Sequence, residues 1–207
     1  MSVLAFENVA LRIGPRVLIE RFDLAVQPGT IATVMGPSGS GKSSLLAFAC
    51  GTLAPGLSAT GRVLLGGREI GMLAPERRRI GILFQDDLLF AHLSVGGNLA
   101  FGLPPGTLDR AARIAAALEE ADLAGFAKRD PATLSGGQRQ RVSLMRMLLA
   151  EPAAVLLDEP FGKLDADLRA RMRAFVFDHV RARGVPCLMV THDREDAMAA
   201  DGPVVAL

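Results

Sequence analysis

A glycine-rich segment near the start of the chain has the residue types and spacing of a phosphate-binding loop. Residues 36–43 read GPSGSGKS and match the pattern G-x-x-x-x-G-K-[ST]. The segment follows the apolar run Ile31–Met35 and opens an apolar helical stretch, which is the context that such a loop requires. Glycines let successive backbone N–H groups point into one concavity, Lys42 would reach the β- and γ-phosphates, and the Ser43 hydroxyl would bind Mg²⁺. The segment therefore predicts a nucleoside triphosphate ligand.

Two acidic residues follow a second apolar run, and they suit the same chemistry. Val155–Leu157 is directly followed by Asp158 and Glu159. In proteins with a phosphate-binding loop, a strand that ends in acids supplies one carboxylate to Mg²⁺ and another group to a water molecule. We therefore predict that Asp158 binds Mg²⁺ and that Glu159 acts on water.

The elements that must position these groups alternate between short apolar runs and longer helical patterns. This alternation predicts an α/β fold with a mostly parallel sheet and crossover helices. Ile31–Met35, Val155–Leu157 and Cys187–Val190 are continuously apolar, as expected of central strands covered on both faces. Val17–Val26 alternates with a period of two and predicts a half-buried antiparallel strand, and Gly61–Leu65 predicts a short strand that ends in a turn.

The middle of the chain, about residues 87–150, is predicted to be helical. Apolar residues spaced by three and four predict an amphipathic helix over Leu108–Ala121. Its apolar positions are Leu108, Ala111, Ile114, Ala115 and Leu118. A further long helix is predicted over Asp165–Arg183, with its arginines on a solvated face. These are Arg169, Arg171, Arg173, Arg181 and Arg183.

Composition restricts the class of protein. With 207 residues, 50% hydrophobic and 22% charged, the chain predicts one main folded core and excludes disorder. A net charge of +1 lacks the positive field of a dedicated nucleic-acid binder, so no nucleic-acid partner is expected. Cys50 and Cys187 lie in apolar stretches and are predicted to be buried thiols. No long apolar segment is present, so we expect a soluble chain that is neither secreted nor membrane-spanning.

Between the two phosphate-site motifs lies LSGGQ at 134–138, followed by an arginine-rich amphipathic helix, and here the sequence resembles the ABC-type ATPases. Gln85 in ILFQDD, Pro160 at the end of LDEP, Leu164-Asp165 and His192 in VTHD follow in that family's order. The resemblance spans essentially the whole chain. Within the family it is similar to short ATPase subunits of bacterial importers for thiamine, iron(III), polyamines and sulfate.

The resemblance implies a role for each matched residue. ATP phosphates would be bound by Gly36, Pro37, Ser38, Gly39, Ser40, Gly41, Lys42, Ser43 and Ser44. Gln85 would face Mg²⁺ and the water beside the γ-phosphate, Glu159 would be the general base and His192 the γ-phosphate switch. Ser135, Gly137 and Gln138 would reach ATP bound by a second copy. A helix N-terminus with free N–H groups suits an anion, and two such half-sites on one chain call for a head-to-tail homodimer.

The chain departs from the family pattern at two places that bear on function, and at Ser44, which replaces the usual Thr, in a minor way. An aromatic ring usually lies under adenine, but this chain has no Tyr or Trp and the matching place is Arg12–Ile13. Ile13 would give apolar contact or Arg12 a guanidinium face, so we predict weak selectivity for adenine over guanine. Lys163 introduces a charge near the expected dimer seam. His92 and His179 lack any motif context and are interpreted as structural.

The resemblance therefore implies the ATP-hydrolysing subunit of an ABC importer that uses ATP and Mg²⁺. The expected architecture is one domain over 1–207: a P-loop core with an N-terminal antiparallel β-subdomain (1–86 and 151–207) and an inserted helical subdomain (about 87–150). Expected partners are a second copy, transmembrane permease subunits and a periplasmic solute-binding protein, at the cytoplasmic face of the bacterial inner membrane. The alternatives are an exporter or cell-division ATPase and a non-transport ABC ATPase.

The segment Asp86–Phe101 is where the resemblance places the permease contact. The apolar residues Leu88, Leu89, Phe90 and Leu93 within it have a second interpretation as ordinary core. The transported solute is not encoded in any of these motifs, because specificity would lie in the permease and the binding protein.

Overall fold

The computed structural model describes residues 2–207 and divides the chain into two compact units. The core unit contains the chain up to Ile82, Ala153–Glu159 and Arg173–Leu207, and the helical unit contains Leu83–Pro152 and Pro160–Met172. Sequence reasoning placed residues 160–172 with the core, whereas the contacts of the structure group them with the helical unit. Within the described residues, no helix combines the length and the apolar character needed to cross a bilayer.

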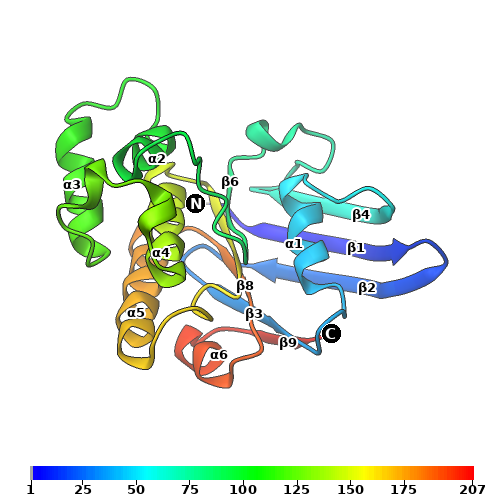
Figure 1. Cartoon of the computed structure of the whole chain (residues 1–207). Coiled ribbons are helices and arrows are strands. Elements are labelled where there is room, and N and C mark those ends of the chain that lie inside the picture. The colour runs from blue at the N-terminus through cyan, green and yellow to red at the C-terminus, as the bar shows by residue number, and fades with distance from the viewer. Residues whose placement is uncertain (1) are drawn as a thin grey trace. The chain divides into compact units, whose positions relative to one another are not determined.

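The first sheet of the core unit is antiparallel and has the strand order β2-β1-β4-β5. Its strands are β1 (Leu4–Ile13), β2 (Arg16–Val26), β4 (Leu57–Leu65) and β5 (Arg68–Glu69). Figure 1 shows β1 between β2 and β4. Phe22 and Val26 are buried while Asp23 and Ala25 are exposed, so the predicted half-buried antiparallel strand is confirmed. The Phe6 and Phe22 rings meet edge to face at 5.5 Å and close the buried side of this sheet.

The second sheet has the strand order β6-β7-β8-β3-β9. Its strands are β3 (Ile31–Met35), β6 (Ile80–Leu83), β7 (Ala154–Asp158), β8 (Cys187–Val190) and β9 (Val204–Ala206). β3 pairs in parallel with β8 and β9, and β7 pairs in parallel with β8. The three continuously apolar runs are therefore interior strands, as predicted. Cys50 and Cys187 are buried free thiols, also as predicted, and burial raises the pKa of the Cys187 thiol.

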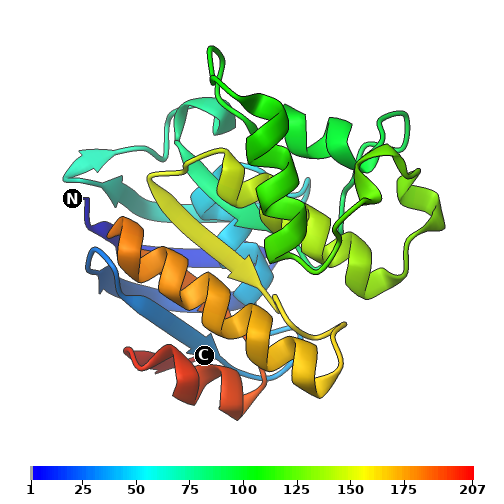
Figure 2. The ribbon, with the colours of Figure 1, turned by 90° about the vertical axis from the view of Figure 1, so that its left-hand side faces the viewer.

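The helices of the core unit are α1 (Lys42–Cys50), the 3-10 turn η1 (Pro75–Arg77) and α6 (Arg194–Ala200). Helix α5 (Ala166–Arg183) begins in the helical unit and continues into the core unit, where its last turns lie beside α6 (Figures 1 and 2). The prediction of a solvated arginine face on α5 is wrong for Arg173. Its side chain is 18% exposed and bonds Asp196 of α6 at 2.9 Å, because α6 covers this part of α5.

The helical unit contains α2 (Val95–Gly102), α3 (Arg110–Glu120) and α4 (Gly136–Leu149), with 3-10 turns η2 (Phe126–Lys128) and η3 (Pro131–Thr133). α3 starts later than predicted, because Asp109 adopts a left-handed conformation (φ 51°) at the helix N-cap. Leu108 consequently lies outside the helix and is 82% exposed. The buried face is formed by Ala117, Leu118 and Ala121, and the predicted apolar positions Ala111 and Ala115 are exposed.

Candidate nucleotide-binding site

The phosphate-binding loop lies where its sequence predicted, between the end of β3 at Met35 and the start of α1 at Lys42. Gly41 is the N-cap of α1 and has φ 96°, a backbone conformation that other residue types adopt only with strain. A Cβ at Gly41 would also lie 3.2 Å from side-chain carbons of Leu18 and Ile19 on β2. Glycine at this position therefore lets the loop turn while β2 packs directly against it.

The Lys42 side chain stabilises the loop through hydrogen bonds to the loop's own backbone. It is almost completely buried, and Nζ donates to the carbonyl oxygens of Gly36 (2.8 Å) and Pro37 (2.7 Å). An ammonium group has three donors. In the part of the chain that the structure describes, the enclosed Ser40 hydroxyl has no hydrogen-bond partner. A buried cation and an unsatisfied hydroxyl beside the N-terminus of α1 form a site for an anion.

Asp158 closes the other side of this site. It is the last residue of β7, it is 6% exposed, and it is hydrogen-bonded to the Ser43 hydroxyl at the start of α1. Desolvation by burial raises the pKa of Asp158, and the neighbouring Glu159 raises it further, while the Ser43 hydrogen bond and the Lys42 charge act in the opposite direction. A carboxylate that is buried at an energetic cost is stabilised when a cation binds to it.

The oxygen donors of Ser43 and Asp158 fit Mg²⁺, a hard cation that prefers oxygen ligands. Over residues 2–207 there is no cluster of three or more His, Cys, Asp or Glu side chains that could hold a metal ion by itself. Mg²⁺ commonly takes one or two protein ligands and completes its octahedron with phosphate oxygens and water. The pair is therefore suited to a metal that arrives with a nucleotide.

Glu159 follows Asp158 in a strained conformation. Its φ is 47°, although it precedes Pro160, a context that favours extended backbone. Its backbone N–H donates to the Val190 carbonyl oxygen at the end of β8 (2.9 Å). Its Oε1 lies 3.0 Å from Nδ1 of His192, whose side chain is 70% exposed. Such strain costs of the order of 1–3 kcal/mol and is found where geometry serves a reaction.

The topology of the second sheet brings these groups to one edge. β3, β7 and β8 run parallel, so their carboxyl ends share an edge of the sheet. The phosphate-binding loop follows the end of β3, Asp158 and Glu159 lie at the end of β7, and His192 follows the end of β8. This edge is where ligands bind in open parallel α/β sheets.

Four of the remaining predicted residues, Gln85, Ser135, Gly137 and Gln138, lie in the helical unit. Ser135 is the N-cap of α4, and its hydroxyl accepts from the Gln138 backbone N–H while Gln138 Oε1 accepts from the Ser135 backbone N–H (2.9 Å). This reciprocal cap orders the start of the helix. A Cβ at Gly137 would lie 3.1 Å from the Lys163 carbonyl oxygen, so glycine permits a close approach there. Gln85 follows β6 in a bend and is exposed.

Ile13, the residue assigned to the nucleotide base, ends β1 and is 47% exposed. It pairs with Arg16 at the turn into β2, and Arg12 pairs with Val17. Leu18 follows Val17 in β2, and a Cβ at Gly41 would lie 3.2 Å from the Leu18 Cβ. This end of the β1–β2 hairpin therefore lies beside the phosphate-binding loop. Ile13 and Arg12 are both exposed, so each is accessible to a base.

Two sets of contacts that support the elements around the site carried no sequence signal. Arg78 is buried and donates to the carbonyl oxygens of Phe48 (2.8 Å) and Ala49 (2.9 Å) at the C-terminal end of α1. Asp87 binds two cationic side chains close to Gln85. Neither role could be found from local patterning, because Arg78 is one of three consecutive arginines and the partners of Asp87 are distant in the chain.

A phosphate-binding loop between a strand and a helix, with acids at the end of a parallel strand, defines a P-loop nucleoside triphosphatase of the α/β class. Residues 19–162 match the family described as ABC transporter. The chain belongs to the ABC transporter family, and it is an ATP-binding protein with the ATPase activity of that family.

Individual relatives agree with this assignment. The chain is 48% identical, over 95% of its length and 92% of the relative, to the uncharacterized ABC transporter ATP-binding protein YnjD of Escherichia coli. It is 42% identical to the sulfate/thiosulfate import ATP-binding protein CysA of Thermosynechococcus vestitus. It is 38% identical to the Fe(3+) ions import ATP-binding protein FbpC 1 of Haemophilus influenzae. These two matches cover 99% of this chain but only 61% and 62% of the relatives.

The fold is also that of a solved ATP-binding cassette. The dimeric structure of a post-hydrolysis state of the cassette MJ0796 bound to ADP and Pi matches with a TM-score of 0.86 and 28% sequence identity. The match covers 99% of this chain and 94% of that chain. The predicted α/β P-loop fold is therefore confirmed.

Proposed function

We propose that this chain is the Mg²⁺-dependent ATP-hydrolysing subunit of an importer, and that it acts as a head-to-tail dimer around two ATP molecules. One observation carries the proposal: Lys42, the Ser43–Asp158 pair and the Glu159–His192 pair all follow carboxyl ends of parallel strands at one sheet edge. This arrangement supports a phosphate site, a metal site and a general base at a single place. The relatives named as import ATP-binding proteins support the importer class over an exporter or a non-transport ATPase.

Each of the site residues in the core unit has a separate role in the reaction. Backbone N–H groups of the loop and the Lys42 ammonium bind and orient the phosphates. Ser43 and Asp158 would hold Mg²⁺, which would supply positive charge to neutralise the charge that develops on the phosphate oxygens. Glu159 orients a water molecule and accepts its proton. His192 acts as the γ-phosphate switch, and its Nδ1 lies 3.0 Å from Glu159 Oε1.

The helical unit supplies the groups directed at ATP of the second copy. Ser135 caps α4, and the free N–H groups of Gly136 and Gly137 begin it, so this end of the helix suits a phosphate. Gln138 is part of the same cap through its side chain. The dimeric state of the matched cassette structure supports a partner subunit. Gln85, from the bend after β6, would face the metal and the attacking water.

Transport would require permease subunits and, in the importer class, a periplasmic solute-binding protein, with this chain on the cytoplasmic face of the inner membrane. An exposed apolar area of the helical unit supports a docking role for the segment after Gln85. Leu88 is 57% exposed and Phe101 is 67% exposed, and the Phe101 ring packs edge to face on Phe90. Part of the predicted permease contact is thus surface rather than core.

The decisive experiment replaces Glu159 with Gln. The amide can hydrogen-bond water but cannot accept its proton, so we expect ATP turnover to fall at least a hundredfold while ATP binding is preserved. Size-exclusion chromatography with Mg²⁺ and ATP should show an accumulated dimer. The matched control is Glu120→Gln on the exposed side of α3, which should hydrolyse ATP at the wild-type rate. Wild-type turnover in Glu159→Gln would remove Glu159 from the role of base and contradict the proposed mechanism.

A further inference from the structure

We propose that Asp87, Lys163 and Arg139 are positioning residues for ATP hydrolysis, and that together they form a polar bridge within the helical unit. The bridge ties the backbone of Gln85 to the start of α4, where Ser135 lies. The inference rests on the proposed function, because Gln85 and Ser135 acquire roles in the reaction only through it. All of the residues involved belong to the helical unit.

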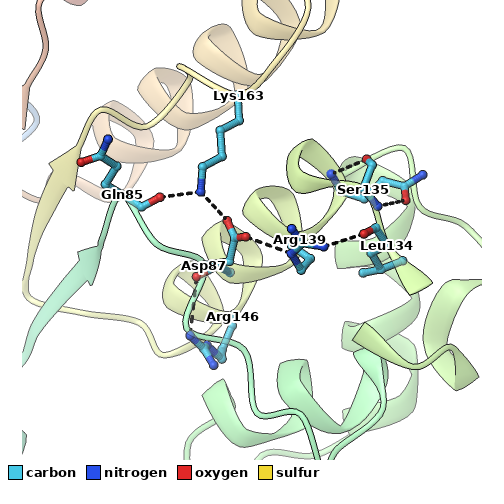
Figure 3. A network of polar contacts seen from close by, with 9 residues as sticks. Gln85, Asp87, Leu134, Ser135, Arg139, Arg146 and Lys163 are labelled. Carbon is cyan, nitrogen blue, oxygen red and sulfur yellow. Dashed lines mark hydrogen bonds and ion pairs between the residues drawn. The ribbon is translucent and has the colours of Figure 1, made fainter. Parts of the chain in front are cut away.

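The bridge is a continuous series of contacts, shown in Figure 3. Lys163 Nζ donates to the backbone carbonyl oxygen of Gln85 (2.7 Å) and lies 3.4 Å from Asp87 Oδ1. On the other side of the carboxylate, Arg139 Nε donates to Asp87 Oδ2 (3.1 Å). Arg139 also donates through a terminal nitrogen to the Leu134 carbonyl oxygen (2.6 Å). Leu134 immediately precedes Ser135. Lys163 therefore binds the carbonyl group of one site residue, and Arg139 binds the carbonyl group next to another.

Charge makes Asp87 the member on which the bridge depends. Its side chain is 11% exposed, against 37% for Lys163 and 38% for Arg139. Two cations therefore share one largely buried carboxylate. Without the negative charge of Asp87 the two cations would repel each other and turn toward solvent, and both carbonyl contacts would be lost.

Two further contacts keep the same elements together. Arg146 lies about two helical turns after Arg139 on α4. It donates to the Leu88 carbonyl oxygen (3.0 Å), and its guanidinium lies 5.2 Å from the centre of the Phe90 ring. α4 thus contacts the segment after Gln85 at both of its ends. The Lys163 backbone also approaches α4 so closely that a Cβ at Gly137 would come within 3.1 Å of the Lys163 carbonyl oxygen.

The bridge predicts a kinetic signature. Affinity for ATP resides mainly in the loop of the core unit, which the bridge does not include. Gln85 and Ser135, in contrast, act on ATP only when they reach the correct positions during closure of the site. Loss of the bridge should therefore lower kcat and leave KM for ATP nearly unchanged, because it removes positioning and leaves nucleotide binding intact.

The test is Asp87→Asn in the full chain, which keeps the side-chain shape and removes the charge. We expect kcat for ATP to fall about tenfold, equivalent to about 1.4 kcal/mol in the barrier. KM should stay within about twofold of wild type. The matched control is Asp122→Asn, which breaks the exposed ion pair between Asp122 and Arg171 in the same unit (2.6 Å). This control should hydrolyse ATP at the wild-type rate.

Lys163 variants provide an independent test that does not depend on the folding of Asp87→Asn. Lys163→Met should lower kcat by a similar factor, and Lys163→Arg should restore it, because a guanidinium can still donate to both acceptors. The double variant Asp87→Asn/Lys163→Met should be no slower than either single variant if the two residues act as one unit.

The outcomes separate the bridge from the proposed function. Wild-type kcat in both Asp87→Asn and Lys163→Met, with Glu159→Gln inactive, would overturn the bridge and leave the ATPase mechanism standing. Additive losses in the double variant, or a rise in KM that accounts for the whole loss, would also overturn it. Wild-type turnover in Glu159→Gln would instead count against the proposed function itself.

Discussion

Replacement of Arg78 by Met should destabilise the chain more than any other single change among the three consecutive arginines. Arg78 is 7% exposed and donates four hydrogen bonds to backbone carbonyl oxygens. Two of the carbonyls, of Phe48 and Ala49, end α1, and the other two, of Leu73 (2.9 Å) and Gly71 (2.6 Å), belong to the following connection. A cation at a helix C-terminus also interacts favourably with the helix dipole.

The magnitude follows from what the carbonyls lose. A buried acceptor left without a donor costs about 1–3 kcal/mol. Gly71 and Leu73 are only half-buried, so water can replace the guanidinium there. The Phe48 carbonyl oxygen still accepts from the Gly51 backbone N–H (3.2 Å), so the Ala49 carbonyl at the end of α1 is the one that loses its donor. We therefore expect a loss of about 2 kcal/mol in the free energy of unfolding. At about 2–4 °C per kcal/mol for a domain of this size, Tm should fall by about 4–8 °C.

Thermal and urea unfolding of three variants would test this reasoning. Arg77→Met is the matched control, because Arg77 is exposed and next to Arg78 in the chain, and it should change the free energy of unfolding by less than about 0.5 kcal/mol. Arg78→Lys should fall between the control and Arg78→Met, since one ammonium cannot reproduce the fork of donors. Equal Tm values for Arg78→Met and Arg77→Met would refute the assigned role of Arg78.

Two further predictions concern the nucleotide site. Because burial raises the pKa of Asp158, the charged carboxylate opposes folding at pH 7, and this cost disappears as protonation proceeds at lower pH. Asp158→Asn should raise the Tm of the nucleotide-free chain at pH 7, measured by differential scanning fluorimetry, and the gain should shrink as the pH is lowered. Mg²⁺-ATP should stabilise the variant less than the wild type, and a lower Tm of the variant at pH 7 would contradict this reasoning. GTP should compete within about tenfold of ATP, because Ile13 offers any purine similar apolar contact, and a hundredfold preference for ATP in a competition assay would show that another residue recognises the base.

Most of the fold could be predicted from the sequence because short-range patterns determine it. Continuous apolar runs correspond to buried parallel strands, and alternation in Val17–Val26 corresponds to a half-buried strand. The phosphate-binding loop was equally accessible, since its glycines and lysine act through backbone conformation and local hydrogen bonds. The start of α3 was mispredicted because the left-handed Asp109 leaves Leu108 outside the helix, and periodicity cannot detect such a backbone conformation.

The sequence by itself was sufficient to predict ATPase chemistry, because the residues that we propose to bind phosphate, Mg²⁺ and water stand in ordered local motifs. Only the tertiary structure decided which side chains outside those motifs support them, and which of several neighbouring residues of the same type does so. Arg77 and Arg78 are the same residue type and adjacent in the sequence, yet only Arg78 is buried, where it contacts the end of α1. Asp87, Arg139 and Lys163 meet although they are far apart in the chain. Such contacts depend on long-range packing, which local residue patterns do not encode.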